Sequence, residues 1–201
     1  PEAKTLSSAS EAMRLYAQSL DQTIEDLKEN RIGHVRISAT PQLGHAMLPG
    51  AIQRFLAGKP EVKVFYDVVN SYRVVENVEA LAADFGLAIA LEPELNNALT
   101  MTKLASVRMV AVMLAGHPLA RKRSVTPRDL SAFPMVGLAR SARLSPPVVA
   151  AFRDAGVPHR VAVEVPYSET ACKLAAAGAG VAVVDAFSAI VHTQSTQLVA
   201  V

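Results

Sequence analysis

HVRISATPQLG at residues 34–44 and VKVFYDVVNSYR at residues 62–73 decide the fold, together with FGLAIA at residues 85–90. Each stretch begins with an apolar run of the length of a buried strand, and the first two continue into an amphipathic helix. Near-continuous apolar strands that alternate with helices are typical of a parallel sheet with helices on its faces. We therefore predict strands at 34–39, 62–69 and 85–90. The second helix is expected to carry Val74, Val75, Val78 and Leu81.

A second array of strands and helices follows the first. Strands are predicted at 107–114, 133–138, 159–165 and 181–184, and helices at 145–156 and 168–178. Two arrays side by side leave a crevice at the carboxyl ends of their strands, where ligands of open α/β sheets bind. The sequence thus predicts an α/β protein with a small-molecule cleft.

The first thirty residues differ from the rest of the chain in their periodicity. Leucine or methionine recurs every seven residues, at Leu6, Met13, Leu20 and Leu27. This pattern predicts a helix with a narrow apolar seam, which suits one partner helix better than a broad core. We expect self-association into a homodimer or tetramer through this seam. The alternative is an ordinary amphipathic helix packed on its own domain.

Composition excludes several classes of protein. Of the 201 residues, 51% are hydrophobic and 19% are charged, which argues against a disordered chain. No apolar run approaches the roughly 20 residues of a membrane-spanning helix. The net charge of +2 is too small to imply nucleic-acid binding by itself, and a single cysteine fits a reducing compartment such as the cytoplasm.

Motifs for enzyme chemistry are absent. The sequence contains no nucleophile elbow, phosphate loop, zinc-protease helix or dinucleotide fingerprint. Its five histidines lie apart, without metal-ligand spacing on a helix. We therefore predict no catalytic residue, no metal site and no cofactor. His34 and His159, at strand starts, are expected to be solvated, and Cys172 is expected to be a small buried hydrophobe.

Three loops carry most of the information about a ligand. Each follows a predicted strand and opens a helix, where free backbone N–H groups favour an anion. We expect them to bind a small carboxylate, such as an amino acid or a derivative, with Arg73 pairing with the carboxylate and Glu169 with an ammonium or guanidinium group. Plain helix capping is the alternative for each loop. The candidate ligand-binding residues are Thr40, Pro41, Gln42, Ser71, Tyr72, Arg73, Tyr167, Ser168 and Glu169.

The stretch from Lys103 to Arg140 is basic, with seven Lys or Arg residues against the single Asp129. It forms either an anion-binding or nucleic-acid face, or a solvated surface around the turn ARKR. Aromatic residues do not alternate with its basic residues, so the stretch lacks the pattern that favours binding of single-stranded nucleic acid.

Several motifs together resemble LysR-type transcriptional regulators. They are PEAKTL before the first helix, GHVRISATPQL, FGLAIA, VAVMLAGHPLA and SETACKLAAAGAGVAVVD. The resemblance implies the type 2 periplasmic-binding-protein fold, in which two Rossmann-like subdomains hold an effector between them. It also implies that DNA is bound only through an N-terminal winged helix-turn-helix, of which PEA resembles the last residues. Members of the family usually continue past LVAV with another strand and helix.

The stretch AGAGVAVVDAFSA is most similar to the branch of opine-catabolism regulators and the regulator of lysine biosynthesis, although Ala186 stands where that branch commonly has proline. This similarity implies an effector derived from an amino acid. The expected organisation is a linker and dimerisation helix at 1–31 and an effector-binding domain at 32–201. Subdomain I is expected at about 32–107 plus a C-terminal return, and subdomain II at about 108–190.

Three functions remain open at this point. The leading hypothesis is the cytoplasmic effector-sensing domain of a transcription regulator, which has no membrane partner. An extracytoplasmic solute-binding protein of a transporter would share the fold but has no use for the seam helix. An enzyme of this fold would need a nucleophile and base that the sequence does not supply. The coding sequence before Pro1 would separate the first two hypotheses.

Overall fold

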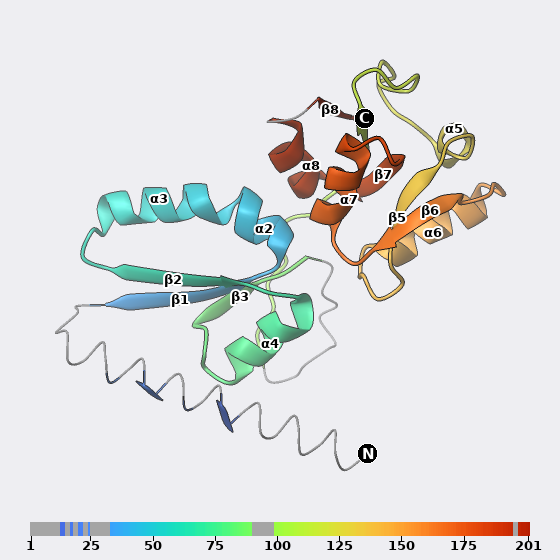
Figure 1. Cartoon of the computed structure of the whole chain (residues 1–201). Helices are drawn as coiled ribbons and strands as arrows, with labels where there is room; N and C mark the ends of the chain where they lie inside the picture. The colour runs from blue at the N-terminus through green and yellow to red at the C-terminus, as the bar shows by residue number, and fades with distance from the viewer. Residues whose placement is uncertain are drawn as a thin grey trace, which may run out of the picture. The chain divides into compact units, whose positions relative to one another are not determined.

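The computed structural model of the chain describes residues 13–14, 17, 20–21, 24, 33–89, 99–194 and 197–201 (Figure 1). The chain divides into two compact units, residues 1–102 and residues 103–201. Each unit contains its own sheet. The predicted division into a helix and two subdomains, with a C-terminal return, stays a prediction.

The first unit contains a three-stranded sheet in the order β2-β1-β3, and all its strand pairs are parallel. Ala39 pairs with Val68 on one side and with Leu87 on the other, so the three strands end at the same edge. This arrangement confirms the predicted parallel sheet. The elements in chain order are β1 (His34–Ala39), α2 (Pro41–Ala46), α3 (Leu48–Gly58), β2 (Lys63–Val68), α4 (Ser71–Glu79) and β3 (Phe85–Leu87).

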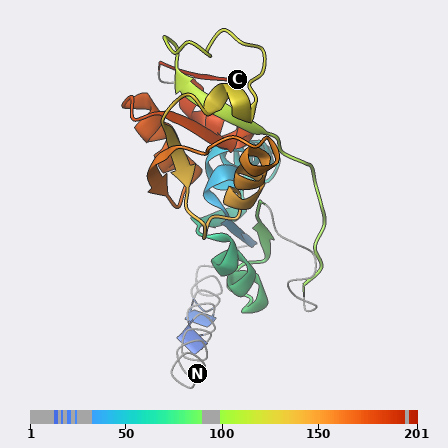
Figure 2. The same ribbon diagram turned by 90° about the vertical axis from the view of Figure 1, so that its right-hand side faces the viewer.

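Helices cover both faces of this sheet, with α3 on one side and α4 on the other (Figure 1 and Figure 2). On the α3 side, Ile37, Ala39 and Leu48 form a buried cluster. On the α4 side, a Cβ at Gly86 would lie 2.5 Å from a methyl carbon of Val74. Glycine is therefore required there for α4 to approach β3 closely.

Two details of the first unit differ from the prediction. The strand expected at 85–90 ends at Leu87. Leu81, expected on the apolar face of α4, lies beyond the end of that helix with a φ of 54° and is 67% exposed. Its N–H donates to the Val78 carbonyl oxygen at 3.1 Å, so it occupies the left-handed position that ends many helices and that usually holds glycine.

The second unit contains a five-stranded mixed sheet in the order β6-β5-β7-β4-β8. β5 is parallel to β6 and β7, whereas β4 is antiparallel to β7 and β8. The strand predicted at 107–114 is present as β4, but its antiparallel direction was not predicted. The elements are β4 (Met109–Leu114), α5 (Pro127–Leu130), β5 (Met135–Leu138), α6 (Ser145–Asp154), β6 (Val161–Val165), α7 (Ser168–Ala176), β7 (Val181–Asp185), α8 (Ala186–Thr193) and β8 (Leu198–Ala200).

The core of the second unit lies between its sheet and its helices, where Met113, Met135 and Phe152 are almost fully buried. His34 and His159, predicted to be solvated, are half-buried. The His159 ring stacks on Phe152 with 4.4 Å between centroids, and burial lowers its pKa below the ordinary value. For His159 the aromatic partner Phe152 accounts for the difference, because the position of a histidine at a strand start does not reveal such a contact.

Replacing Leu81 with glycine should stabilise the protein. The left-handed conformation costs an L-residue about 1–2 kcal/mol. The greater freedom of glycine in the unfolded chain offsets about 0.5–1 kcal/mol of that gain. We therefore expect Leu81→Gly to raise the free energy of unfolding by about 0.5–1 kcal/mol in urea titrations, with an unchanged denaturant slope. Leu81→Ala, which keeps a Cβ, is the control and should give no gain. A glycine variant no more stable than the alanine variant would contradict this account.

Candidate functional site

The first candidate loop connects β1 to α2 and contains two buried polar atoms without a partner. Thr40 precedes α2 and is 3% exposed, but its side chain makes no capping hydrogen bond. Within the described part of the chain, neither Thr40 Oγ1 nor Gln42 Oε1 has a hydrogen-bond partner. Pro41 fills the first position of α2. Plain helix capping therefore does not explain Thr40.

The main contacts of the second loop, between β2 and α4, are made within the start of α4 itself. Asn70, rather than Ser71, caps α4, and its Oδ1 accepts a hydrogen bond from the Arg73 N–H at 3.0 Å. The Arg73 guanidinium donates to Glu76 Oε2 at 3.0 Å, so a local carboxylate already pairs with it. Tyr72 is exposed. Capping by Asn70 was missed because the prediction started the loop one residue later.

The third loop connects β6 to α7 and resembles the first. Tyr167 precedes α7 without a capping bond from its side chain. Ser168 is 3% exposed, and its Oγ has no partner in the part of the chain that the structure describes. Glu169 accepts a hydrogen bond from Lys173 Nζ at 2.8 Å, one turn along the same helix. The buried hydroxyl of Ser168 is thus the unexplained feature of this loop.

Parallel pairing brings the first two loops to the same edge of the first sheet, because β1 and β2 end in register. The third loop lies at the corresponding edge of the second sheet, where Leu138 of β5 pairs with Val165 of β6. The convergence of the third loop on the first two stays a prediction.

A further loop at the edge of the second sheet was missed by the sequence analysis. The Ala139 N–H donates to the Val165 carbonyl oxygen at 2.8 Å, so the loop that carries Arg140 begins beside the start of α7. The signal was available in the sequence, because Ala139 and Arg140 directly follow the strand predicted at 133–138 and thus also lie at a carboxyl end. Arg140 therefore joins the candidates for an anionic ligand.

The other polar groups of the described segments do not form a reactive centre. These segments hold no group of three or more His, Cys, Asp or Glu side chains that could bind a metal ion. Cys172 is fully buried, as predicted, and burial raises its pKa to about 12, with further contributions from Asp185 and Glu169. The thiol is therefore protonated and unreactive at neutral pH.

Among the described helices, none combines the length and the apolar character needed to cross a membrane.

Two buried serines of the second unit allow a matched test of the unpartnered hydroxyl. Ser145 is 4% exposed, and its Oγ donates to the Leu138 carbonyl oxygen at 2.9 Å. We expect Ser145→Ala to lower the free energy of unfolding by about 1 kcal/mol, because it removes a buried hydrogen bond. Ser168→Ala removes a hydroxyl without a partner and should leave the ligand-free protein as stable or up to about 1 kcal/mol more stable. Equal losses in chemical denaturation would show that Ser168 is bonded in solution.

Comparisons with known proteins agree with this architecture. A family model described as "LysR substrate binding domain" matches residues 28–201. The regulatory protein NocR of Agrobacterium tumefaciens (strain T37) is 30% identical over 172 residues, which are 86% of this chain and 57% of NocR. The transcriptional activator protein LysR of Escherichia coli (strain K12) is 30% identical over 171 residues, or 85% of this chain and 54% of that protein. The chain thus spans little more than half the length of these two relatives.

A solved structure shows the same fold. The effector binding domain of BenM, in a structure with its effector benzoate, superposes with a TM-score of 0.67 at 23% identity, over 85% of this chain and 77% of that one. This match confirms the predicted α/β fold of the periplasmic-binding-protein type. The family describes a binding domain and the two relatives are regulators, in agreement with the prediction of a regulator domain rather than an enzyme. Because the family match covers far more than half of the sequence, the chain belongs to the LysR substrate binding domain family, the effector-binding domains of LysR-type regulators.

Proposed function

We propose that this chain senses a small carboxylate or amino-acid-like inducer for a cytoplasmic LysR-type transcription regulator. The inducer would bind in a cleft between the two units and change their geometry or that of the subunits. That change would be transmitted to an N-terminal winged helix-turn-helix, which binds the DNA. A ligand shifts such an equilibrium only by its differential affinity for the two states.

The observation that carries this proposal is a pair of buried hydroxyl groups, Thr40 and Ser168. Each unit contributes one, at the carboxyl end of a strand, and neither has a hydrogen-bond partner within the described residues. A buried polar group without a partner costs about 1–3 kcal/mol. A ligand that accepts or donates hydrogen bonds at both positions would recover this cost on binding.

The proposed chemistry of the inducer follows from the groups around these hydroxyls. The start of α7 presents backbone N–H donors and the positive end of a nine-residue helix, which favour an anion. The loop that carries Arg140 begins beside the start of α7, and Arg140 could pair with a carboxylate. Arg73 already pairs with Glu76. The proposed lining also includes Pro41, Gln42, Ser71, Tyr72 and Tyr167. The relative BenM takes benzoate, itself a carboxylate.

An effector derived from an amino acid is part of this proposal because of the sequence resemblance at AGAGVAVVDAFSA. The names of NocR and LysR, each 30% identical to this chain, do not state their effectors. A solute-binding protein of a transporter is the alternative, since it shares the fold. A helix-turn-helix pattern encoded before Pro1 would favour the regulator, and a signal peptide there would favour the transporter protein.

Removing the Ser168 hydroxyl should weaken inducer binding. A hydrogen bond to a charged group contributes about 1.5–3 kcal/mol, so we expect Ser168→Ala to raise the dissociation constant roughly tenfold to a hundredfold. Isothermal titration calorimetry with amino acids, opines and dicarboxylates would identify the ligand and measure this loss.

The control for this experiment is Ser131→Ala, because the Ser131 hydroxyl donates to the Arg128 carbonyl oxygen at 2.9 Å, far along the chain from the three loops. It should bind the inducer as the wild type does. An uncharged best ligand, or unchanged affinity of Ser168→Ala, would contradict the carboxylate site.

Self-association is proposed through the seam helix and the flank of the first unit. Met13 and Leu20 are helical and 74% and 62% exposed in the single chain, while Leu6 and Leu27 lie outside the described residues. On the flank, Phe55 of α3 is also exposed. Exposed apolar side chains at a seven-residue interval favour a partner helix.

A charge in the seam should weaken this assembly. We expect Leu20→Glu to shift the protein toward monomer in multi-angle light scattering, because the carboxylate would be buried against the partner helix. Leu104→Glu is the matched control, since Leu104 is also an exposed leucine but lies outside the helix. An oligomeric state that Leu20→Glu leaves unchanged would mean that the helix packs elsewhere.

A further inference from the structure

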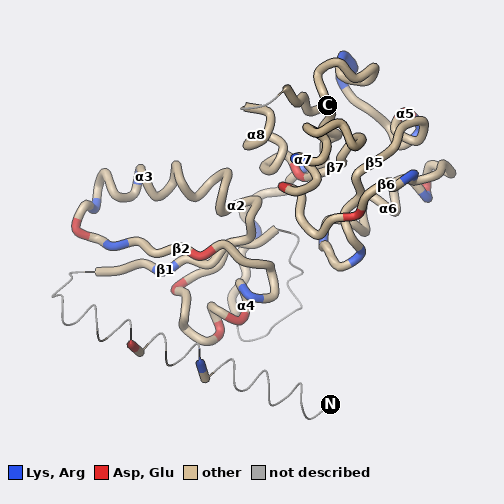
Figure 3. The backbone as a smooth tube through the Cα atoms, viewed as in Figure 1, with Lys and Arg blue, Asp and Glu red and all other residues tan. Residues whose placement is uncertain are grey.

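The second unit has a strong local excess of positive charge. Between Lys103 and Arg153 the chain carries nine Lys or Arg residues and a single acidic residue, Asp129. Four of the nine lie within eight residues, on the turn that precedes α5 and on α5 itself: Arg121, Lys122, Arg123 and Arg128. Blue segments mark both places in Figure 3. The effector site proposed above uses none of these four residues.

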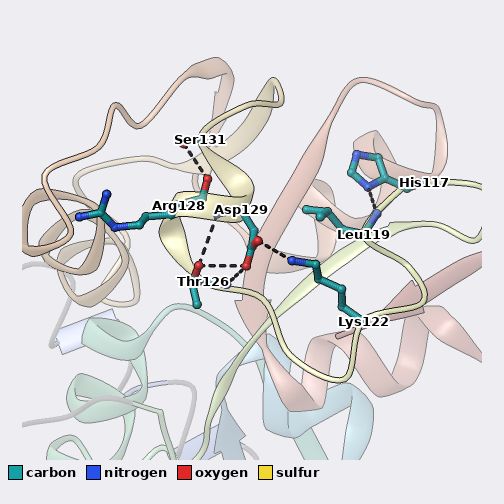
Figure 4. A network of polar contacts seen from close by, with 7 residues as sticks. All are labelled: His117, Leu119, Lys122, Thr126, Arg128, Asp129 and Ser131. Carbon is teal, nitrogen blue, oxygen red and sulfur yellow. Dashed lines mark hydrogen bonds and ion pairs between the residues drawn. The ribbon is translucent and has the colours of Figure 1, made fainter.

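A network of hydrogen bonds fixes this turn against α5 (Figure 4). Thr126 and Asp129 form a capping box at the start of α5. Lys122 Nζ contacts Asp129 Oδ1 at 2.5 Å, and His117 Nδ1 accepts a hydrogen bond from the Leu119 N–H at 3.2 Å. The bond from Lys122, followed by those from Thr126, lowers the pKa of Asp129 to about 2. The only carboxylate of the stretch is therefore ionised and already bonded within the turn.

The three arginines around this network remain available. Arg121, Arg123 and Arg128 are exposed. In the described part of the protein, none of their guanidinium groups makes a hydrogen bond or an ion pair. Arg121 and Arg123 flank Lys122 in the chain, and Arg128 adjoins Asp129, so the Lys122–Asp129 pair holds the backbone of the turn beside that of α5. The Arg128 side chain points away from Lys122 (Figure 4), so the arginines spread their charge over more than one side of α5. Guanidinium groups bind phosphate through two parallel hydrogen bonds.

The surroundings of the three arginines favour a polyanion over a protein partner. Residues 121–124, 126 and 128 are exposed and polar, whereas the nearby Leu119 and Leu130 are buried in the core. A specific protein interface needs apolar or aromatic side chains at its centre. A surface of charged groups on a fixed turn is suited to purely electrostatic contacts, such as those that proteins make with DNA phosphates.

We propose that Arg121, Arg123 and Arg128 contact the phosphate backbone of double-stranded DNA without reading its sequence. We call these three arginines the patch. The inference rests on the proposed function, because a DNA-binding domain in the same protein would hold DNA at a high effective concentration near them. Sequence recognition remains with that domain. The patch adds affinity that depends on salt and is insensitive to the base sequence.

The experiment measures binding of the 201-residue chain to a fluorescent duplex of scrambled sequence, by anisotropy over a series of salt concentrations. We expect weak binding at low salt, with a dissociation constant on the order of 10⁻⁴ M. The triple variant R121Q/R123Q/R128Q should bind at least tenfold more weakly at the lowest salt. Its plot of log affinity against log salt should be shallower by about 2.7, because each neutralised phosphate contributes about 0.9 to the slope. The single variant R128Q should show about one third of this change in slope.

The control is R54Q/K59Q/R160Q, which removes the same number of charges from exposed residues outside this stretch. It should keep the slope of the wild type. The proposal is overturned if the wild type does not bind at low salt, or if the control is weakened as much as the patch variant. It is also overturned if the patch variant alters only salt-dependent self-association, which would assign the arginines to an acidic protein surface. Inducer calorimetry on the patch variant should be unchanged, so this test fails or succeeds independently of the proposed effector site.

Discussion

Parallel strand pairing is the constraint on which the rest of this structure depends. In a parallel sheet the carboxyl ends of neighbouring strands lie at one edge, and β1, β2 and β3 end there in register. The helices that follow must begin at the same edge. Thr40, Gln42 and the start of α4 are brought together in this way, and β5 and β6 do the same for Arg140 and Ser168 in the second unit. The position of the candidate site is thus a consequence of strand direction.

The hydroxyls of Thr40 and Ser168 are buried at these edges without a hydrogen-bond partner among the described residues, which is unfavourable for the stability of the fold. Ser145 and Ser168 are equally buried, yet only Ser145 has a hydrogen-bond partner among the described residues. The Ser145 hydroxyl stabilises the fold, whereas a buried hydroxyl without a partner, such as that of Ser168, costs stability. Binding residues commonly violate the local rules that hold in the remainder of a core. This difference separates the two serines, which the sequence alone does not distinguish.

Much of the fold could be predicted from apolar patterning, and the failures have physical causes. The runs at 34–39 and 109–114 are long enough to indicate strands, but periodicity carries no information on direction, so the antiparallel direction of β4 was not predicted. α8 was missed because Asp185 both ends β7 and caps the helix, which leaves no connecting loop to indicate a boundary. For the site, the loops were found by their position after strands. The pairing of Arg73 with Glu76 depends on side-chain geometry, which the spacing of residues does not determine.

The central claim is that Thr40 and Ser168 are kept for a ligand rather than for the fold. The most direct measurement is the melting temperature of the wild type and of the double variant Thr40→Val/Ser168→Ala, each with and without a saturating inducer. A ligand that binds only the native state raises the melting temperature by an amount that grows with the logarithm of its concentration over its dissociation constant. We predict that the double variant alone melts at or above the temperature of the wild type and that the inducer scarcely raises it. A double variant that melts lower alone, or that the inducer stabilises as much as the wild type, would contradict the account.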